Sequence, residues 1–171
     1  MIPKKFIPDL CLSDIYEISA EKLRSDGVKA VILDIDNTLV TYDDPKPTVS
    51  VLAWFEKLRE NGIGIAFVSN NSPERVDLFN RDLGFPAFPD AKKPSPKYYK
   101  EAMTRLGVKP EETTAIGDQV FTDVFAAKRA GMRTIMVRPI KDKLTLLFRV
   151  KRKLEIPVLK KYAKIHKNDK K

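Results

Sequence analysis

The stretch "VILDIDNTLV" (residues 31–40) carries two carboxylates at the end of an apolar run. The run Val31–Leu33 leads directly into Asp34 and Asp36. Because it is short, continuous and rich in branched side chains, it predicts a buried strand over residues 29–36. Carboxylates are strongly hydrated, so two of them at the edge of a core require a compensating partner.

Apolar runs and helical patterns alternate after this stretch. Further strands are predicted over 63–70, 86–90, 113–118 and 133–139, and helices over 47–62, 72–84, 95–107 and 120–131. Strands that alternate with helices of about a dozen residues imply a parallel sheet covered on both faces. We therefore predict an α/β three-layer sandwich with a central parallel sheet of about five strands.

Charge divides the chain into two parts. The formal net charge is +9, with 32 Lys and Arg against 23 Asp and Glu. Residues 1–140 hold 20 of each sign, whereas residues 141–171 hold 12 basic and 3 acidic residues. We predict a domain over 1–140, including an N-terminal helical extension over 1–28, followed by a basic amphipathic tail over 141–171.

The tail has apolar residues at the spacing of three and four that is typical of one helix face, namely Leu144, Leu147, Val150 and Leu154. Pro157 is expected to end or kink this helix, and Phe148 falls off the stripe. A basic amphipathic segment can lie on an anionic membrane, contact RNA phosphates, or pack on its own domain. We favour the membrane and the packed helix over nucleic acid.

Composition limits the compartment. Cys11 is the only cysteine, so no internal disulfide can form and a reducing compartment fits. No apolar run approaches the roughly 20 residues that span a bilayer, and no signal peptide is predicted. We expect a cytoplasmic protein, or one that is peripheral at the inner face of the membrane. A homo-oligomer is compatible with this composition.

Polar residues follow several predicted strands at the point where each strand ends. They are Asp34 and Asp36, then Ser69 and Asn70, then Gly117 and Asp118, with Lys93 in the loop after 86–90. Parallel sheets bind ligands at the carboxyl ends of their strands. Clustered carboxylates with few neutral partners suit Mg²⁺, and a serine hydroxyl with a lysine suits a phosphate. The sequence therefore predicts a magnesium and phosphate site at this edge.

Four short motifs in order resemble those of the haloacid dehalogenase-like hydrolases. They are "DIDNTL" (34–39), "FVSNN" (67–71), "KKP" (92–94) and "GDQVFTD" (117–123), and the match covers about residues 29–138. The resemblance implies a Rossmann-like fold and phosphatase activity. It implies that Asp34 is the nucleophile, which forms an aspartyl-phosphate, and that Asp36 is the general acid and then the base.

The same resemblance implies the remaining site residues. Mg²⁺ would be held by Asp34, by Asp118 and by Asp36 through its backbone carbonyl, with Asp123 as a further carboxylate behind these ligands. Ser69, Asn70 and Lys93 would bind the phosphoryl group. Lys92 competes with Lys93 for this role, and Asn70 has an alternative role as a loop-shaping residue.

The substrate depends on what covers the site. Only one helix is predicted between Asp34 and Ser69, and one between Ser69 and Lys93, so no cap domain is expected. The opening stretch from Phe6 to Val40 looks like the capless subfamily IIIA, which includes bacterial phosphatases and the mitochondrial phosphatidylglycerophosphate phosphatase. That likeness implies phosphatidylglycerophosphate as substrate, with a soluble sugar or nucleotide phosphate as the alternative.

Two other classes of protein are alternatives to a phosphatase. A receiver-type phosphoacceptor domain would carry its aspartate after the third strand and its lysine after the fifth, and this chain does neither. A non-catalytic protein that binds RNA or the ribosome through the tail is the other alternative, and it predicts no Mg²⁺-dependent turnover.

Overall fold

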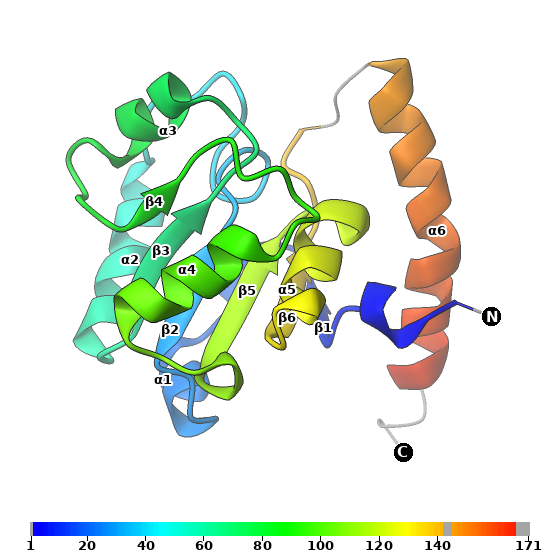
Figure 1. The fold of residues 1–171 in the computed structure, drawn as a ribbon, viewed down its shortest axis with the longest axis horizontal. Coiled ribbons are helices and arrows are strands. Elements are labelled where there is room, and N and C mark those ends of the chain that lie inside the picture. The colour runs from blue at the N-terminus through cyan, green and yellow to red at the C-terminus, as the bar shows by residue number, and fades with distance from the viewer. Residues whose placement is uncertain (1, 142–144, 167–171) are drawn as a thin grey trace.

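A computed structural model of the chain describes residues 2–141 and 145–166 (Figure 1). Six parallel strands form one sheet in the order β1-β6-β5-β2-β3-β4. The strands are β1 (Leu10–Leu12), β2 (Ala30–Leu33), β3 (Gly64–Val68), β4 (Ala87–Phe88), β5 (Thr113–Gly117) and β6 (Arg133–Val137). The α-helices are α1 (Ala20–Ser25), α2 (Val49–Glu60), α3 (Pro73–Asn80), α4 (Lys97–Leu106), α5 (Phe125–Arg129) and α6 (Leu146–His166). Short 3₁₀ helices are η1 (Lys4–Phe6), η2 (Ile15–Glu17) and η3 (Pro110–Glu112), and η4 (Val120–Val124) is π-helical.

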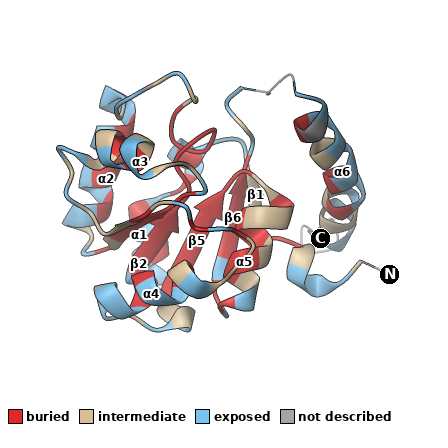
Figure 2. Cartoon of the chain, turned by 45° about the horizontal axis from the view of Figure 1, so that its top comes forward, coloured by how far each residue is buried: buried red, intermediate tan, exposed pale blue. Residues whose placement is uncertain are grey.

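The central strands β3, β2, β5 and β6 are largely buried on both faces, as Figure 2 shows, whereas the edge strand β1 is partly exposed. Val31 and Leu33 of β2 pack into a core with α1, α2 and α3, whereas Ile32 packs into a second core with α4 and α5. Successive side chains of a strand point to opposite faces, so a continuous apolar run serves both cores. The predicted α/β three-layer architecture is confirmed.

The N-terminal segment corrects the predicted strand count. The prediction of helices throughout residues 1–28 is wrong for β1, which pairs in parallel with β6 and gives the sheet six strands rather than about five. Leu10 lies opposite Ile135 in this pair. Three residues are too few to show a strand periodicity, so only the pairing with a distant segment defines β1.

Local capping accounts for where several helices begin. The Ser19 hydroxyl accepts from the backbone N–H of Lys22 at the start of α1, and the Ser72 hydroxyl accepts from Arg75 at the start of α3. The predicted helix over 120–131 differs in form, because it begins as the π-helical turn η4 and becomes α5 at Phe125.

The C-terminal helix α6 packs beside the end of the sheet that carries β1, as Figure 1 shows. Pro157 is expected from the sequence to end or kink the helix, and the first of these two expectations is wrong, since α6 runs from Leu146 through Pro157 to His166. Pro157 is exposed, and the buried Val158 next to it anchors this part of the helix on the domain. Packing can thus offset the backbone hydrogen bond that a proline removes.

The apolar stripe predicted for the tail does not face the domain. Val150 and Leu154 are 45% and 58% exposed, whereas Phe148 and Val158 are buried. Leu144 lies outside the described residues, and the side chain of Leu147 is not described either. The sequence spacing allowed two faces, and contact with the domain selected the one that includes Phe148.

Two further findings concern the apolar character of the helices and the environment of Cys11. Among the described helices, none combines the length and the apolar character needed to cross a bilayer. Cys11 on β1 is half-buried, its backbone N–H donates to the Tyr162 hydroxyl of α6 at 3.0 Å, and burial raises the pKa of its thiol to about 11. A protonated thiol is a poor nucleophile, which agrees with a structural role for Cys11.

Candidate active site

The polar residues predicted at the strand ends meet at the carboxyl edge of the sheet. Asp34 directly follows β2, Ser69 follows β3 and Asp118 follows β5. The loop after β4 brings Lys93 to the same place, whereas Lys92 is exposed. Four separated segments of the chain therefore contribute to one site.

Lys93 is the buried cation of this site. Its Nζ donates to Oδ1 of Asp34 at 2.7 Å, to Oδ1 of Asp123 at 2.6 Å and to the backbone carbonyl of Val68 at 3.0 Å. Burial lowers the pKa of Lys93, but the carboxylates of Asp123 and Asp34 outweigh burial and hold that pKa well above its ordinary value. The ammonium group therefore stays charged and fully hydrogen-bonded.

Asp34 is held through both carboxylate oxygens. Its Oδ2 accepts from the hydroxyl of Thr38 at 3.2 Å, while Oδ1 accepts from Lys93. Burial raises the pKa of the Asp34 carboxyl to about 6, because Lys93 only partly offsets burial and the neighbouring carboxylates of Asp123 and Asp36. The carboxyl is thus oriented, and it is ionised at neutral pH.

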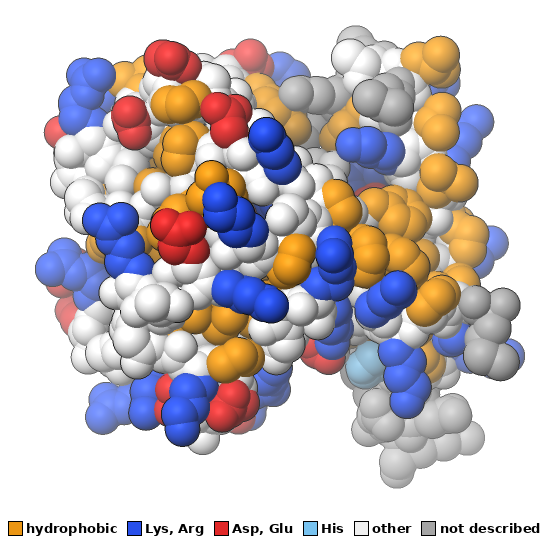
Figure 3. Space-filling view, viewed as in Figure 1, with side chains coloured by type: hydrophobic (Ala, Val, Ile, Leu, Met, Phe, Trp, Pro, Cys, Tyr) orange, Lys and Arg blue, Asp and Glu red, His pale blue; other side chains and the backbone are white. Residues whose placement is uncertain are grey.

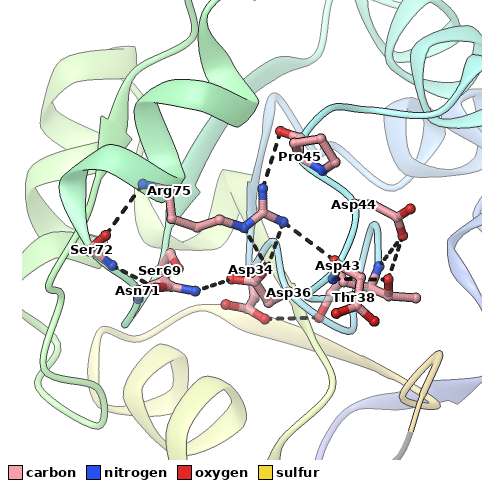
Figure 4. A network of polar contacts seen from close by, with 11 residues as sticks. Asp34, Asp36, Thr38, Asp43, Asp44, Pro45, Ser69, Asn71, Ser72 and Arg75 are labelled. Carbon is pink, nitrogen blue, oxygen red and sulfur yellow. Dashed lines mark hydrogen bonds and ion pairs between the residues drawn. The ribbon is translucent and has the colours of Figure 1, made fainter.

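Asp36 faces a different set of partners, which Figure 4 shows. Its Oδ1 accepts from Nε and Nη2 of Arg75, at 3.1 and 2.8 Å, and its Oδ2 accepts from Nδ2 of Asn71 at 2.9 Å. The two aspartates of the motif therefore have different charge partners, Lys93 for Asp34 and Arg75 for Asp36.

Three carboxylates could hold a metal ion. One oxygen each of Asp34, Asp118 and Asp123 lies within 4.8 Å of the others. Oδ1 of Asp118 is buried and has no hydrogen-bond partner among the described residues, although Oδ2 accepts from Nη2 of Arg152 at 2.5 Å. Burial, with Asp123 and Asp34, raises the pKa of Asp118 well above its ordinary value, against the lowering effect of Arg152. A divalent cation would satisfy the orphaned oxygen and offset the repulsion, so these residues fit one.

Asp123 reaches the site because the residue beneath it is a glycine. A Cβ added to Gly117 would lie 2.5 Å from Cβ and from Cγ of Asp123. Oδ2 of Asp123 accepts from the backbone N–H of Gln119 at 3.1 Å, and Oδ1 accepts from Lys93. The π-helical turn that carries Asp123 therefore closes directly onto the end of β5.

Ser69 and Asn70 make different hydrogen bonds at the site. The Ser69 hydroxyl is buried and accepts from the backbone N–H of Asn71 at 3.0 Å, which leaves its own O–H able to donate. The side chain of Asn70 accepts from the Lys93 backbone N–H at 2.7 Å and donates to the Lys93 carbonyl at 3.4 Å. Asn70 therefore fixes the backbone of the loop that carries Lys93, which agrees with the alternative prediction that it shapes a loop.

A polar cavity of about 260 Å³ opens over these groups. Its lining includes the predicted residues Asp34, Asp36, Ser69, Asn70 and Lys93, together with Asn71, Tyr42, Gln119 and Thr122. One helix, α2, lies between β2 and β3, and one, α3, lies between β3 and β4. Within the described ranges no cap domain interrupts these connections, so the capless prediction is confirmed.

Sequence reasoning missed two arginines. Arg75 lies in the first turn of α3, where the helix dipole disfavours a cation, and this misfit was the available signal. In the sequence, Arg152 is one of several basic residues of the tail and no motif distinguishes it. The signal there was Glu155, one of the three acidic residues among residues 141–171, placed three residues after Arg152.

The parallel sheet places the chain in the α/β class, with a carboxylate-rich site at the edge of the sheet, and comparison with known proteins gives its family. The profile described as haloacid dehalogenase-like hydrolase matches residues 14–131, and the chain belongs to this family. It is 40% identical over 159 residues to "Probable phosphatase YqeG" of Bacillus subtilis, covering 93% of this chain and 92% of that protein. It is a phosphatase, that is, a phosphoric monoester hydrolase. The alternative of a non-catalytic RNA-binding protein is therefore set aside.

Two more distant similarities bear on fold and substrate. "Phosphatidylglycerophosphate phosphatase 1, chloroplastic/mitochondrial" of Arabidopsis thaliana is 22% identical over 169 residues, covering 92% of this chain and 48% of that protein. The cobalt-bound deoxy-D-mannose-octulosonate 8-phosphate phosphatase of Haemophilus influenzae superposes with a TM-score of 0.55 at 20% identity, covering 81% of this chain and 88% of that one. The latter shows the same fold.

Proposed function

We propose that the chain hydrolyses a phosphomonoester with Mg²⁺ through an aspartyl-phosphate on Asp34. One observation carries the proposal. Asp34 is held by Lys93 in the lining of a polar cavity, next to a buried Asp118 whose Oδ1 has no hydrogen-bond partner among the described residues. This arrangement offers a nucleophile, a cation for the phosphoryl oxygens and a ligand for a metal in one place.

In the first step a carboxylate oxygen of Asp34 attacks the phosphorus, and the bond from phosphorus to the ester oxygen breaks. Asp36 donates a proton to the leaving alkoxide, which departs as an alcohol. In the second step Asp36 takes a proton from a water molecule that attacks the aspartyl-phosphate, and inorganic phosphate leaves Asp34. Arg75 and Asn71 hold Asp36 separately from Asp34, which supports different roles for the two carboxyls.

Donors around the cavity support binding of the phosphoryl group. Ser69 and Lys93 line the cavity, where the Ser69 hydroxyl can donate and Lys93 supplies a positive charge, and Asn70 fixes the backbone of Lys93. Asp34 and Asp118 would hold Mg²⁺, the carbonyl of Asp36 would add a ligand, and Asp123 would stand behind them. Bound there, Mg²⁺ would neutralise charge on the phosphoryl oxygens and on the carboxylates.

The substrate that we favour is phosphatidylglycerophosphate. No cap domain covers the cavity in the part of the chain that the structure describes, and the similarity to the plant phosphatidylglycerophosphate phosphatase runs over 92% of this chain. The close alternative is a soluble sugar or nucleotide phosphate, which a polar cavity of about 260 Å³ also suits.

The outer face of α6 supports a lipid surface as partner. Leu146, Val150 and Leu154 are exposed at intervals of four residues. They lie beside four exposed basic residues, Arg149, Lys153, Lys160 and Lys164. Figure 3 shows hydrophobic and basic side chains gathered over α6. An apolar stripe flanked by cations suits the anionic cytoplasmic face of a membrane, so we place the protein in the cytoplasm with peripheral binding there.

A phosphate-release assay with Mg²⁺ tests both levels of the proposal. It compares phosphatidylglycerophosphate in vesicles with sugar phosphates, nucleotide phosphates and p-nitrophenyl phosphate. We expect turnover on the vesicles that Asp34→Asn abolishes. No turnover on any ester would refute the mechanism, whereas a preference for soluble esters would refute only the lipid assignment.

A vesicle co-sedimentation assay tests the surface on α6. We expect Val150→Ser with Leu154→Ser to reduce binding to phosphatidylglycerol vesicles. Leu52→Ser, an exposed leucine on α2, is the matched control and should bind as the wild type does. Equal binding by all three proteins would exclude α6 as the contact.

A further inference from the structure

The helix α6 contributes one side chain to the catalytic edge. Arg152 extends from α6 to the end of β5, where Nη2 donates to Oδ2 of Asp118 at 2.5 Å and Nη1 donates to the Asp118 backbone carbonyl at 2.7 Å. Both the side chain and the backbone of Asp118 are therefore held by one guanidinium. The two residues are 34 positions apart, so only the return of α6 onto the domain makes this contact.

Arg152 is itself held in a fixed position. Its Nη1 also donates to Oε2 of Glu155 at 2.7 Å, and the guanidinium carbon lies 4.7 Å from the centre of the Phe148 ring. Glu155 is buried, and its Oε1 accepts from the backbone N–H of Val120 at 2.8 Å. One turn of α6 thus clamps the segment from Asp118 to Val120 at both of its ends.

The contact divides the two oxygens of Asp118. Oδ2 is bound by Arg152, and Oδ1 is buried without a hydrogen-bond partner in the described part of the chain. Lys93 bonds to Asp34 and Asp123 but not to Asp118, so the charge of Arg152 balances the third carboxylate of the cluster. A carboxylate fixed through one oxygen presents the other oxygen in a defined direction.

We propose that Arg152 is a positioning residue that orients the carboxylate of Asp118 toward the metal ion, so that α6 is part of the catalytic site. The inference rests on the proposed metal-dependent function. This role of α6 is distinct from the membrane contact proposed for its outer face. Glu155 supports it by fixing Arg152.

The test measures Mg²⁺ binding to metal-free protein by isothermal titration calorimetry, a readout that is independent of turnover. We expect Arg152→Met to weaken Mg²⁺ binding by about 10- to 100-fold, as loss of a partner of a metal ligand typically does. Arg152→Lys should recover part of the affinity, because it restores the charge and one donor. Arg149→Met, an exposed arginine one turn earlier on α6, should bind Mg²⁺ as the wild type does.

Circular dichroism of each variant reports whether α6 still folds. If Arg152→Met unfolds, Glu155→Gln takes its place, since a glutamine keeps an acceptor for Val120 but loses the charge that faces Arg152. Glu155→Gln should also weaken Mg²⁺ binding, by a smaller factor than Arg152→Met does. Unchanged or tighter Mg²⁺ binding by a folded variant would overturn the role of Arg152. Absence of binding by the wild type would instead overturn the proposed metal site itself.

Discussion

Nζ of Lys93 lies 2.7 Å from Oδ1 of Asp34, although 59 positions separate the two residues in the chain. The same nitrogen lies 2.6 Å from Asp123, so one buried cation joins three segments of the site. A buried carboxylate is costly unless a charge partner and hydrogen bonds compensate it. Lys93 supplies both for Asp34, which explains how a nucleophile can stand at the end of an apolar strand.

Replacement of Asp34 by asparagine should abolish phosphate release. The amide cannot form the acyl phosphate, so kcat for p-nitrophenyl phosphate with Mg²⁺ should fall by about 10³-fold or more. Asp43→Asn, an exposed aspartate paired with Lys141, should leave kcat unchanged. Residual turnover of Asp34→Asn within tenfold of the wild type would contradict a nucleophilic role.

Replacement of Asp36 by asparagine should depend on the leaving group. General acid catalysis is worth about 10²- to 10⁴-fold, and an alkyl phosphate needs the proton more than p-nitrophenyl phosphate does. We expect kcat for an alkyl phosphate to fall further than kcat for p-nitrophenyl phosphate. Equal losses on both esters would show that Asp36 does not protonate the leaving group.

The stability of the metal-free protein should depend on the ionisation of Asp34. Burial raises the pKa of this carboxyl from 3.8 to about 6, so the folded chain binds a proton more tightly than the unfolded chain between these values. The contribution of Asp34 to the free energy of unfolding should therefore be greatest below pH 4 and decrease as the pH rises through 6, by up to about 3 kcal/mol.

Urea unfolding in EDTA, from pH 4 to pH 7, checks this dependence. Asparagine does not titrate, so the stability of the wild type relative to Asp34→Asn should decrease over the range. A constant difference between the two proteins would contradict the raised pKa.

Mg²⁺ should stabilise the folded chain at pH 7 through Asp118. Binding to the folded state alone adds about 2.7 kcal/mol at a concentration 100 times the dissociation constant. Asp118→Ala should lose this stabilisation, and Asp77→Ala, an exposed aspartate of α3, should keep it. Thermal unfolding with and without Mg²⁺ measures both, and an Mg²⁺-dependent rise in Tm for Asp118→Ala would argue against Asp118 as a ligand.

Gly117→Ala should displace Asp123. The new methyl group would lie 2.5 Å from Cβ of Asp123, so we expect a loss of about 1 to 3 kcal/mol of stability together with reduced turnover. Gly64→Ala is the matched control on β3, because its methyl group would meet Leu106 at an ordinary 3.5 Å. Chemical unfolding and phosphate release compare the two, and similar stability for both would refute the steric argument.

The amino-acid sequence by itself determined the central strands, the helices between them and the grouping of Asp34, Ser69, Lys93 and Asp118. These features follow from local patterns. Buried strands are short apolar runs, helices begin at capping residues, and residues that follow parallel strands must meet at one edge.

Only the tertiary structure decided the role of the chain ends and of two arginines. Leu10 pairs with Ile135 across 125 positions, and a strand of three residues has no periodicity of its own. The spacing of α6 allowed more than one buried face, and contact with the domain chose the one that carries Arg152 to Asp118. Likewise, Arg75 meets Asp36 across 39 positions. Such contacts depend on how distant segments pack. Residues far apart in the chain come within bonding distance only after the fold has closed the long loop between them.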